Sequence, residues 1–240
     1  MTAHNILPPI LYEDAYCVVL HKPSGLYSIP DRKQVEPNVK DMLIAKYGLI
    51  YTVHRLDAGT SGVIIFAKDE ATHKQLSAQF EERLTQKIYI GIVQGIPQIK
   101  TGTIQVPILE HPGKNGTMVV HHKGKEAITN YTVLQELRRY SVLQFEILTG
   151  RTHQIRVHCK DMGHPIVADN LYGDAAGVYL SKIKKKFNLS KKEDEEKPLL
   201  GRLALHAAKL SIQVHNTHHT FEAPLPKDMA IAIKQLEKYC

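Results

Sequence analysis

Residues 54–62 constrain this chain more than any other part of its sequence. They read His-Arg-Leu-Asp-Ala-Gly-Thr-Ser-Gly, so Asp57 stands two residues after Arg55 and directly before small, turn-forming residues. The apolar run at 63–67 follows at once and predicts a buried strand. The sequence therefore predicts a carboxylate on a loop that a rigid sheet holds in place, a common position for catalytic groups.

A second dense motif, Gly-Arg-Thr-His-Gln-Ile-Arg-Val-His, occupies residues 150–158. Apolar residues recur here at helical spacing, which predicts a short helix with Thr152 as its cap and Gly163 just past its end. The polar face of this helix carries Arg156. That face begins near the helix N-terminus, where anions are favoured.

Periodicity and turn residues predict further elements. We expect helices over residues 38–47 and 69–84 and from Asp228 onward, and strands over residues 87–95, 141–149, 203–207 and 209–214. In the second helix Leu76, Phe80 and Leu84 recur every four residues and should share its buried face. No linker divides the chain, so a single domain over residues 1–240 is expected. The highly charged stretch 181–197 is predicted to be a mobile surface insertion.

Composition favours a polyanionic partner without requiring one. The 240 residues carry a net charge of +7, which a basic enzyme with no nucleic-acid partner would fit equally well. The three cysteines have no short spacing and predict no disulfide framework. The sequence shows no signal-peptide pattern and no apolar run approaching the roughly 20 residues of a membrane span. We therefore expect a cytoplasmic protein that does not enter membranes.

The sequence predicts neither a metal site nor a nucleotide cofactor. Histidines cluster at 121–122 and 215–219, but no cysteine or carboxylate accompanies them at ligand spacing. No glycine-rich phosphate loop of the nucleotide-binding kind is present.

Asp57 is the candidate catalytic group. A carboxylate can act as a nucleophile or a base when it is held ionised and close to the reacting carbon. A neighbouring guanidinium, Arg55 or Arg156, would favour that charged form. The alternative is a structural aspartate that caps a turn or a helix. Tyr89 could stack on a nucleobase and reach a polar group with its hydroxyl, or it could simply pack on its strand.

Together the two motifs resemble the RluA-type pseudouridine synthases. The similarity extends over residues 8–226 and includes the segments around Tyr89, at 163–169 and at 205–207. The resemblance implies an α+β fold with a mixed, mostly antiparallel, curved central sheet in two halves. Helices flank that sheet and the active cleft lies between its halves. It also implies catalysis without cofactor or metal.

The resemblance also implies a role for each site residue. Asp57 would be the essential aspartate, Tyr89 the base-stacking tyrosine and Arg156 the ion-pair partner of Asp57. Arg55 would fill the space left by an extruded uridine, and Leu205 would line the pocket.

The implied activity is the isomerisation of uridine to pseudouridine in structured ribosomal or transfer RNA, by a monomer. Asp57 would either attack the anomeric carbon or remove a sugar proton to give a glycal, and both routes remain open. The target uridine would have to be flipped out at a cost of a few kcal/mol. Many relatives carry an N-terminal RNA-binding domain. Here the similarity begins near residue 8, so we expect target choice to rest on the catalytic domain or its loops. Two alternatives are a non-catalytic RNA-binding factor and a hydrolase that uses Asp57 on a glycosidic bond.

Overall fold

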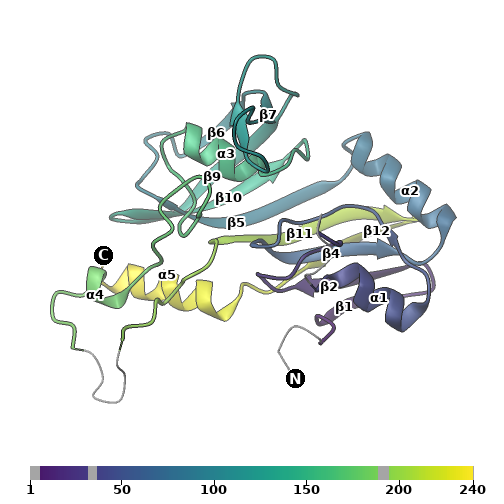
Figure 1. Ribbon diagram of the computed structural model, residues 1–240, viewed down its shortest axis with the longest axis horizontal. Coiled ribbons are helices and arrows are strands. Elements are labelled where there is room, and N and C mark those ends of the chain that lie inside the picture. Colours follow the sequence, from purple (N-terminus) through teal and green to yellow (C-terminus); the bar gives the residue numbers. More distant parts are fainter. Residues whose placement is uncertain (1–5, 32–36, 189–194, 240) are drawn as a thin grey trace. The chain divides into compact units, whose positions relative to one another are not determined.

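The computed structural model describes residues 6–31, 37–188 and 195–239 (Figure 1). The chain forms two compact units, each built from two segments. Unit 1 comprises Met1–Tyr89 with His206–Pro224, and unit 2 comprises Ile90–Leu205 with Leu225–Cys240. The expectation of a single domain over residues 1–240 stays a prediction.

Unit 1 is, over the residues that the structure describes, a sheet with two helices. Its strands follow the order β1 (Ile10–Glu13), β2 (Cys17–Lys22), β4 (Ser61–Ala67) and β11 (Leu205–Val214), with β3 (Tyr51–Thr52) beside β4 and β12 (Thr217–Glu222) beside β11. The pair β4–β11 is parallel, and the other pairs of this unit are antiparallel. The helices are α1 (Val39–Tyr47) and α2 (Glu70–Glu81).

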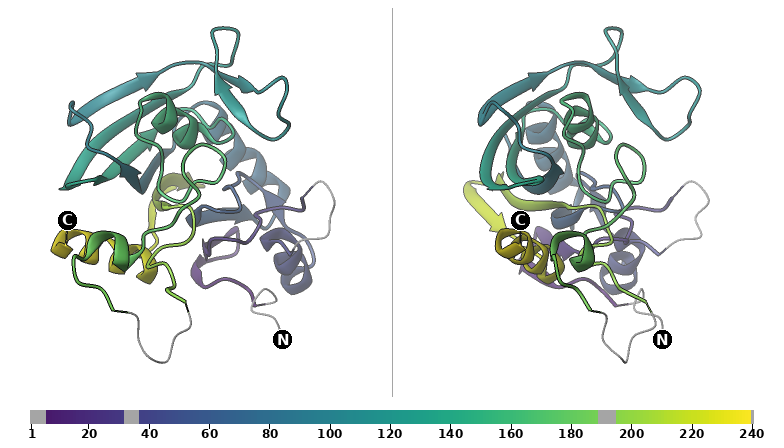
Figure 2. Two further views of the ribbon diagram at one scale, coloured as in Figure 1. Left: turned by 60° about the vertical axis from the view of Figure 1, so that its left-hand side comes forward. Right: turned by 90° about the vertical axis from the view of Figure 1, so that its left-hand side faces the viewer.

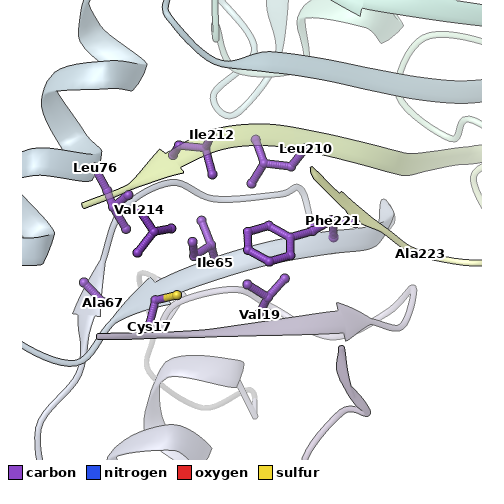
Figure 3. Packing of buried hydrophobic residues seen from close by; sticks show 11 residues of the cluster. Cys17, Val19, Ile65, Ala67, Leu76, Leu210, Ile212, Val214, Phe221 and Ala223 are labelled. Atoms are coloured by element: carbon purple, nitrogen blue, oxygen red, sulfur yellow. The ribbon is translucent and has the colours of Figure 1, made fainter. Parts of the chain in front are cut away.

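Strand β4 lies at the centre of this unit and is buried at every position, as the apolar run predicted. Successive side chains of a strand point to opposite faces. Val63 and Ile65 therefore join one hydrophobic cluster while Ile64 and Phe66 join another on the opposite face. Figure 3 shows the first cluster, with Ile65 between side chains of β2 and β11. Burial on both faces makes β4 a rigid base for the loop that precedes it.

The two predicted helices of unit 1 are confirmed, with one error in length. The side chains of Asn38 and Asp69 cap α1 and α2 by accepting backbone N–H groups. Helix α2 ends at Glu81 rather than at Leu84, because Arg83 takes a left-handed conformation with φ 62°. The Leu84 N–H then bonds the Gln79 carbonyl at 2.9 Å and closes the helix end. As a result Leu84 is 66% exposed and does not share the buried face.

In its described residues, unit 2 contains a sheet, whose β10–β9 and β9–β6 pairs are antiparallel, a separate hairpin and three helices. Strand β5 (Gln86–Gln94) continues from unit 1 into unit 2. The other sheet strands are β10 (Tyr140–Ile147), β9 (Ile128–Leu137) and β6 (Thr101–Gln105), in that order, and the hairpin is β7 (Ile108–Glu110) with β8 (Met118–Val120). The helices are α3 (Gln154–Asp161), α4 (Leu180–Ile183) and α5 (Lys227–Tyr239), and α4 lies beside α5 in both views of Figure 2. The predicted strands 87–95 and 141–149 are thus confirmed.

The start of α3 differs from the prediction, because Thr152 does not cap it. Helix α3 begins two residues later, after His153, which has φ 55° and makes no side-chain capping bond. The side chain of Gln154 instead ties the helix start to the preceding loop, since its Oε1 accepts from the Arg151 N–H at 3.0 Å and from the Thr149 hydroxyl at 2.7 Å. A first-turn glutamine that reaches backwards has no simple sequence signal.

The runs 203–207 and 209–214 are not two strands, since the single strand β11 spans them from Leu205. Residues 189–194 of the charged stretch 181–197 lie outside the described residues, so its mobility stays a prediction. Both units combine helices with mostly antiparallel strands, which confirms the α+β fold class.

We expect Gly62→Ala to destabilise the protein by at least about 3 kcal/mol. Gly62 has φ 126°, and a Cβ there would meet the Ala207 carbonyl oxygen where β4 and β11 run side by side. Urea unfolding measures the change. Gly113→Ala is the control, since its Cβ would find only the His111 ring at 3.8 Å. Equal stabilities of the two variants would contradict the close approach of β4 and β11.

Candidate active site

The loop that carries Asp57 is fixed on its N-terminal side by Leu56. Leu56 is 6% exposed and belongs to the hydrophobic cluster that includes α1. The Ser28 hydroxyl donates to the Leu56 carbonyl at 2.8 Å and accepts from the Leu56 N–H at 3.0 Å. The Thr60 N–H donates to the Asp57 carbonyl at 3.0 Å and closes the turn behind it. Both sides of Asp57 are therefore held by backbone hydrogen bonds.

A fully buried ammonium group joins this loop to the turn after β2. The Lys22 Nζ donates to the carbonyl oxygens of Pro23 at 3.0 Å, Leu26 at 2.7 Å and Ala58 at 3.1 Å, and Lys22 is 0% exposed. The Gly25 N–H donates to the same Ala58 carbonyl at 2.8 Å. A buried cation must be satisfied by hydrogen bonds, so Lys22 fixes these carbonyls relative to one another. Sequence reasoning found the turn but missed the role of Lys22.

Ser61 and His206 connect the C-terminal side of the loop to β11. The Ser61 Oγ lies 3.0 Å from His206 Nδ1, and His206 Nε2 lies 3.2 Å from the Ala223 carbonyl oxygen. Because a carbonyl only accepts, Nε2 carries the proton and Ser61 donates to Nδ1. Both side chains are buried. The pair therefore holds β4 against β11 and does not form a nucleophile exposed to substrate.

Asp57 and Tyr89 lie near each other in unit 1. Both are half-buried, while Arg55 is exposed on the same loop. Burial raises the pKa of the Tyr89 phenol, and the negative charge of Asp57 raises it further. Tyr89 also packs against the cluster that contains Leu56. A neutral phenol that lies on the core beside a carboxylate can offer a flat face and an O–H donor.

His54 attaches the start of the motif to β4. The Ile65 N–H donates to His54 Nε2 at 3.2 Å, and the imidazole stacks on the Phe80 ring with centroids 4.6 Å apart. Burial, and then the charge of Lys87, lowers the pKa of His54 from 6.5 to about 3. His54 is therefore a neutral acceptor at working pH, a structural role that sequence reasoning missed.

Arg156 is a buried cation of unit 2, and its described partner is Asp169. Its Nε and Nη2 donate to Asp169 Oδ2 and Oδ1 at 2.7 and 2.8 Å, and the two side chains are 7% and 0% exposed. Burial raises the pKa of Asp169, but the Arg156 hydrogen bonds and charge and the N–H groups of Leu171 and Tyr172 outweigh it and leave that pKa below its usual value. Sequence reasoning predicted Asp57 as the partner and missed Asp169.

The pairing of Arg156 with Asp57 stays a prediction, as does the pocket role of Leu205. Leu205 belongs to unit 2 and is 3% exposed at the start of β11. The residue before it accepts the Ile92 N–H at 3.0 Å, so the backbone next to Leu205 is bonded to β5.

No group of three or more histidines, cysteines or carboxylates within the described ranges is arranged to hold a metal ion. In the same part of the chain, no helix is both long and apolar enough to cross a membrane. Cys17 and Cys159 are buried free thiols.

Residues 16–161 match the family model of the RNA pseudouridylate synthases. A dual-specificity RNA pseudouridine synthase RluA of Escherichia coli K12 is 33% identical to this chain. The alignment covers 93% of this chain and 99% of the relative. The chain belongs to the RluA-type RNA pseudouridine synthases. An uncharacterized RNA pseudouridine synthase of Synechocystis is 38% identical, over 94% of this chain and 68% of the relative. Enzymes of this family isomerise uridine to pseudouridine.

The fold of this synthase also matches a solved relative. The structure of human RNA pseudouridylate synthase domain containing 1 superposes with a TM-score of 0.72 at 25% identity, over 96% of this chain and 89% of that one. This likeness covers both units.

We expect Asp169→Asn to destabilise the synthase by about 3–5 kcal/mol, because it removes the negative charge that accepts two hydrogen bonds from the buried Arg156 guanidinium. Asp228→Asn is the matched control. Asp228 receives the same two-bond contact from Arg202, but its side chain is 40% exposed. That variant should lose no more than about 1 kcal/mol. Urea unfolding compares the two, and equal losses would contradict the importance of burial.

We expect the stability of the synthase to depend on pH through His54. The unfolded chain takes up a proton at His54 as pH falls below 6.5, whereas the folded protein does not until about pH 3. The free energy of unfolding should therefore fall by at most about 1.4 kcal/mol for each pH unit below 6.5. His54→Gln should flatten the dependence of the unfolding free energy on pH between 6.5 and 5. The exposed His218→Gln should leave it unchanged, and identical slopes in both variants would refute the burial of a neutral His54.

Proposed function

We propose that this synthase modifies uridines in ribosomal RNA, transfer RNA or both, with Asp57 as its catalytic carboxylate. The observation that carries the assignment is the fixation of the Asp57 loop from three sides, by Leu56, Lys22 and the Ser61–His206 pair. A reacting group needs such preorganisation, because small misplacements of a carboxylate are costly in rate. The names of its relatives, a dual-specificity RNA pseudouridine synthase and a ribosomal large subunit pseudouridine synthase, support these RNA classes.

The reaction needs only one fixed carboxylate. The bond between the ribose anomeric carbon and uracil N1 breaks, the uracil turns, and a bond forms between the same carbon and uracil C5. The proton leaves C5 and N1 gains one, so atoms balance without water or an external nucleophile. Asp57 would assist by attacking the anomeric carbon or by removing a sugar proton, and both routes fit a half-buried carboxylate.

The other site residues would hold the flipped nucleotide. The neutral ring of Tyr89 would stack on the uracil, next to Asp57. The exposed Arg55 would occupy the gap left in the RNA helix and so offset part of the few kcal/mol that base flipping costs. Arg156 would pair with Asp57 in addition to Asp169, and Leu205 would line the uracil pocket.

We further propose that the synthase works as a monomer in the cytoplasm and needs neither metal nor cofactor. The chemistry above requires none. The lysines and arginines behind the net charge of +7 would contact RNA phosphates. The contribution of these contacts to RNA affinity should weaken as the salt concentration rises.

We expect Asp57→Asn to slow turnover severely while RNA binding and stability stay near those of the wild type. Removing the carboxylate charge should slow isomerisation by about 10³-fold or more. The measurement is tritium release from ribosomal and transfer RNA pools labelled at C5 of uridine, with filter binding on the same RNA.

The exposed Asp174→Asn is the control and should release tritium like the wild type. If Asp57→Asn turned over normally, the assignment of Asp57 would be wrong. If the wild type released no tritium from either pool while binding both, the proposed substrates or the activity would be wrong.

A further inference from the structure

The phenol of Tyr172 lies where three elements of unit 2 meet. Its hydroxyl oxygen accepts the N–H of Met118, in strand β8, at 2.7 Å. The same oxygen lies 2.7 Å from Nδ1 of His153, the residue that precedes α3. The ring is 6% exposed and packs with Ile108 and Val157 in a buried cluster. One hydroxyl therefore joins the β7–β8 hairpin to the beginning of α3.

The ring of Tyr172 also contacts the Arg156 guanidinium. The Arg156 Cζ lies over the ring, 5.0 Å from its centroid, within the range of a cation–π interaction. The Tyr172 N–H donates at 3.2 Å to Asp169 Oδ1, the oxygen that also accepts from Arg156. Arg156 is thus bounded by a carboxylate at its edge and by an aromatic ring on its face, and Tyr172 contributes to both.

The β7–β8 hairpin, which Tyr172 contacts through the Met118 N–H, is flanked by basic residues. Residues 111–125, which include β8 and the turns on either side of it, contain three lysines and three histidines and no carboxylate. The lysines Lys114, Lys123 and Lys125 are all exposed. The exposed lysines around β8 suit the phosphates of an RNA backbone, and the carboxylate of the hairpin strands is that of Glu110 at the end of β7.

We propose that Tyr172 is a positioning residue that couples the seating of this hairpin to the orientation of Arg156. RNA phosphates that bind the hairpin lysines would draw β8 into place. The Met118 N–H would then fix the Tyr172 hydroxyl, and the Tyr172 ring would hold the guanidinium. This inference rests on the proposed function, because it takes RNA as the substrate and Arg156 as part of the reacting site. It makes the orientation of Arg156 respond to RNA bound at the hairpin.

A double-mutant cycle distinguishes this coupling from a role of Tyr172 in core packing alone. One change is Tyr172→Phe, which keeps the ring over Arg156 and removes only the hydroxyl. The other is the triple change of Lys114, Lys123 and Lys125 to Gln. Each of the four proteins is assayed for RNA affinity and for the single-turnover rate constant of tritium release at saturating RNA. Urea unfolding shows whether all four are folded.

In the background with Tyr172 intact, the lysine changes should lower affinity and also lower the saturated rate constant by about tenfold. In the Tyr172→Phe background they should lower affinity by the same factor but the rate constant by less than about threefold, because the connection is already broken. Tyr172→Leu, which also removes the ring, should lower the rate constant further than Tyr172→Phe.

The matched control is the triple change of Lys182, Lys185 and Lys186 to Gln. These lysines are exposed, belong to the same unit and carry the same total charge. The control should lower affinity without affecting the saturated rate constant in either background. If Tyr172→Phe and the hairpin lysine changes affected the rate constant independently, the coupling would be overturned. It would also be overturned if the hairpin lysine changes left the saturated rate constant unchanged. A wild type without turnover would instead overturn the proposed function.

Discussion

The buried ammonium of Lys22 is the interaction on which the candidate active site depends. An unsatisfied charge in a protein interior would cost many kcal/mol, so its three carbonyl acceptors cannot move away independently. One acceptor belongs to Ala58, directly after Asp57, and the other two belong to the turn after β2. Because the acceptors are backbone atoms, Lys22 fixes the course of the chain and not merely one side chain. Asp57 therefore lies on a backbone that the buried Lys22 ammonium holds in a fixed position.

The two motif-associated carboxylates have opposite environments. Asp169 is fully buried, bonded to Arg156 and to two backbone N–H groups, and its pKa is held below the usual value. Asp57 is half-buried, on a loop beside the neutral phenol of Tyr89. A carboxylate that is saturated with donors cannot approach a substrate, whereas one at the edge of the core can. This difference in environment fits a structural role for Asp169 and the proposed catalytic role of Asp57.

The sequence predicted those parts of the structure that have a local physical cause. The apolar run at 63–67 predicted β4, and Asn38 and Asp69 predicted two helix starts. Leu84 was misplaced because a left-handed Arg83 ended the helix, and arginine carries no signal for that conformation. The bond from Lys22 to Ala58 was missed because the two residues lie 36 positions apart, and the bond from Arg156 to Asp169 was missed because they lie 13 positions apart. Such pairs are set by packing, and neither spacing nor periodicity reveals them.

The most direct test of the account is the single-turnover rate of Asp57→Glu, measured beside its RNA affinity and its stability. The variant keeps the carboxylate and its charge but moves it by one methylene group on an unchanged loop. If the fixed backbone positions the reacting oxygen, affinity and stability should stay within about twofold while the rate falls at least about 10²-fold. A rate within tenfold of the wild type would contradict the account, because a carboxylate that tolerates displacement does not depend on the loop that holds it.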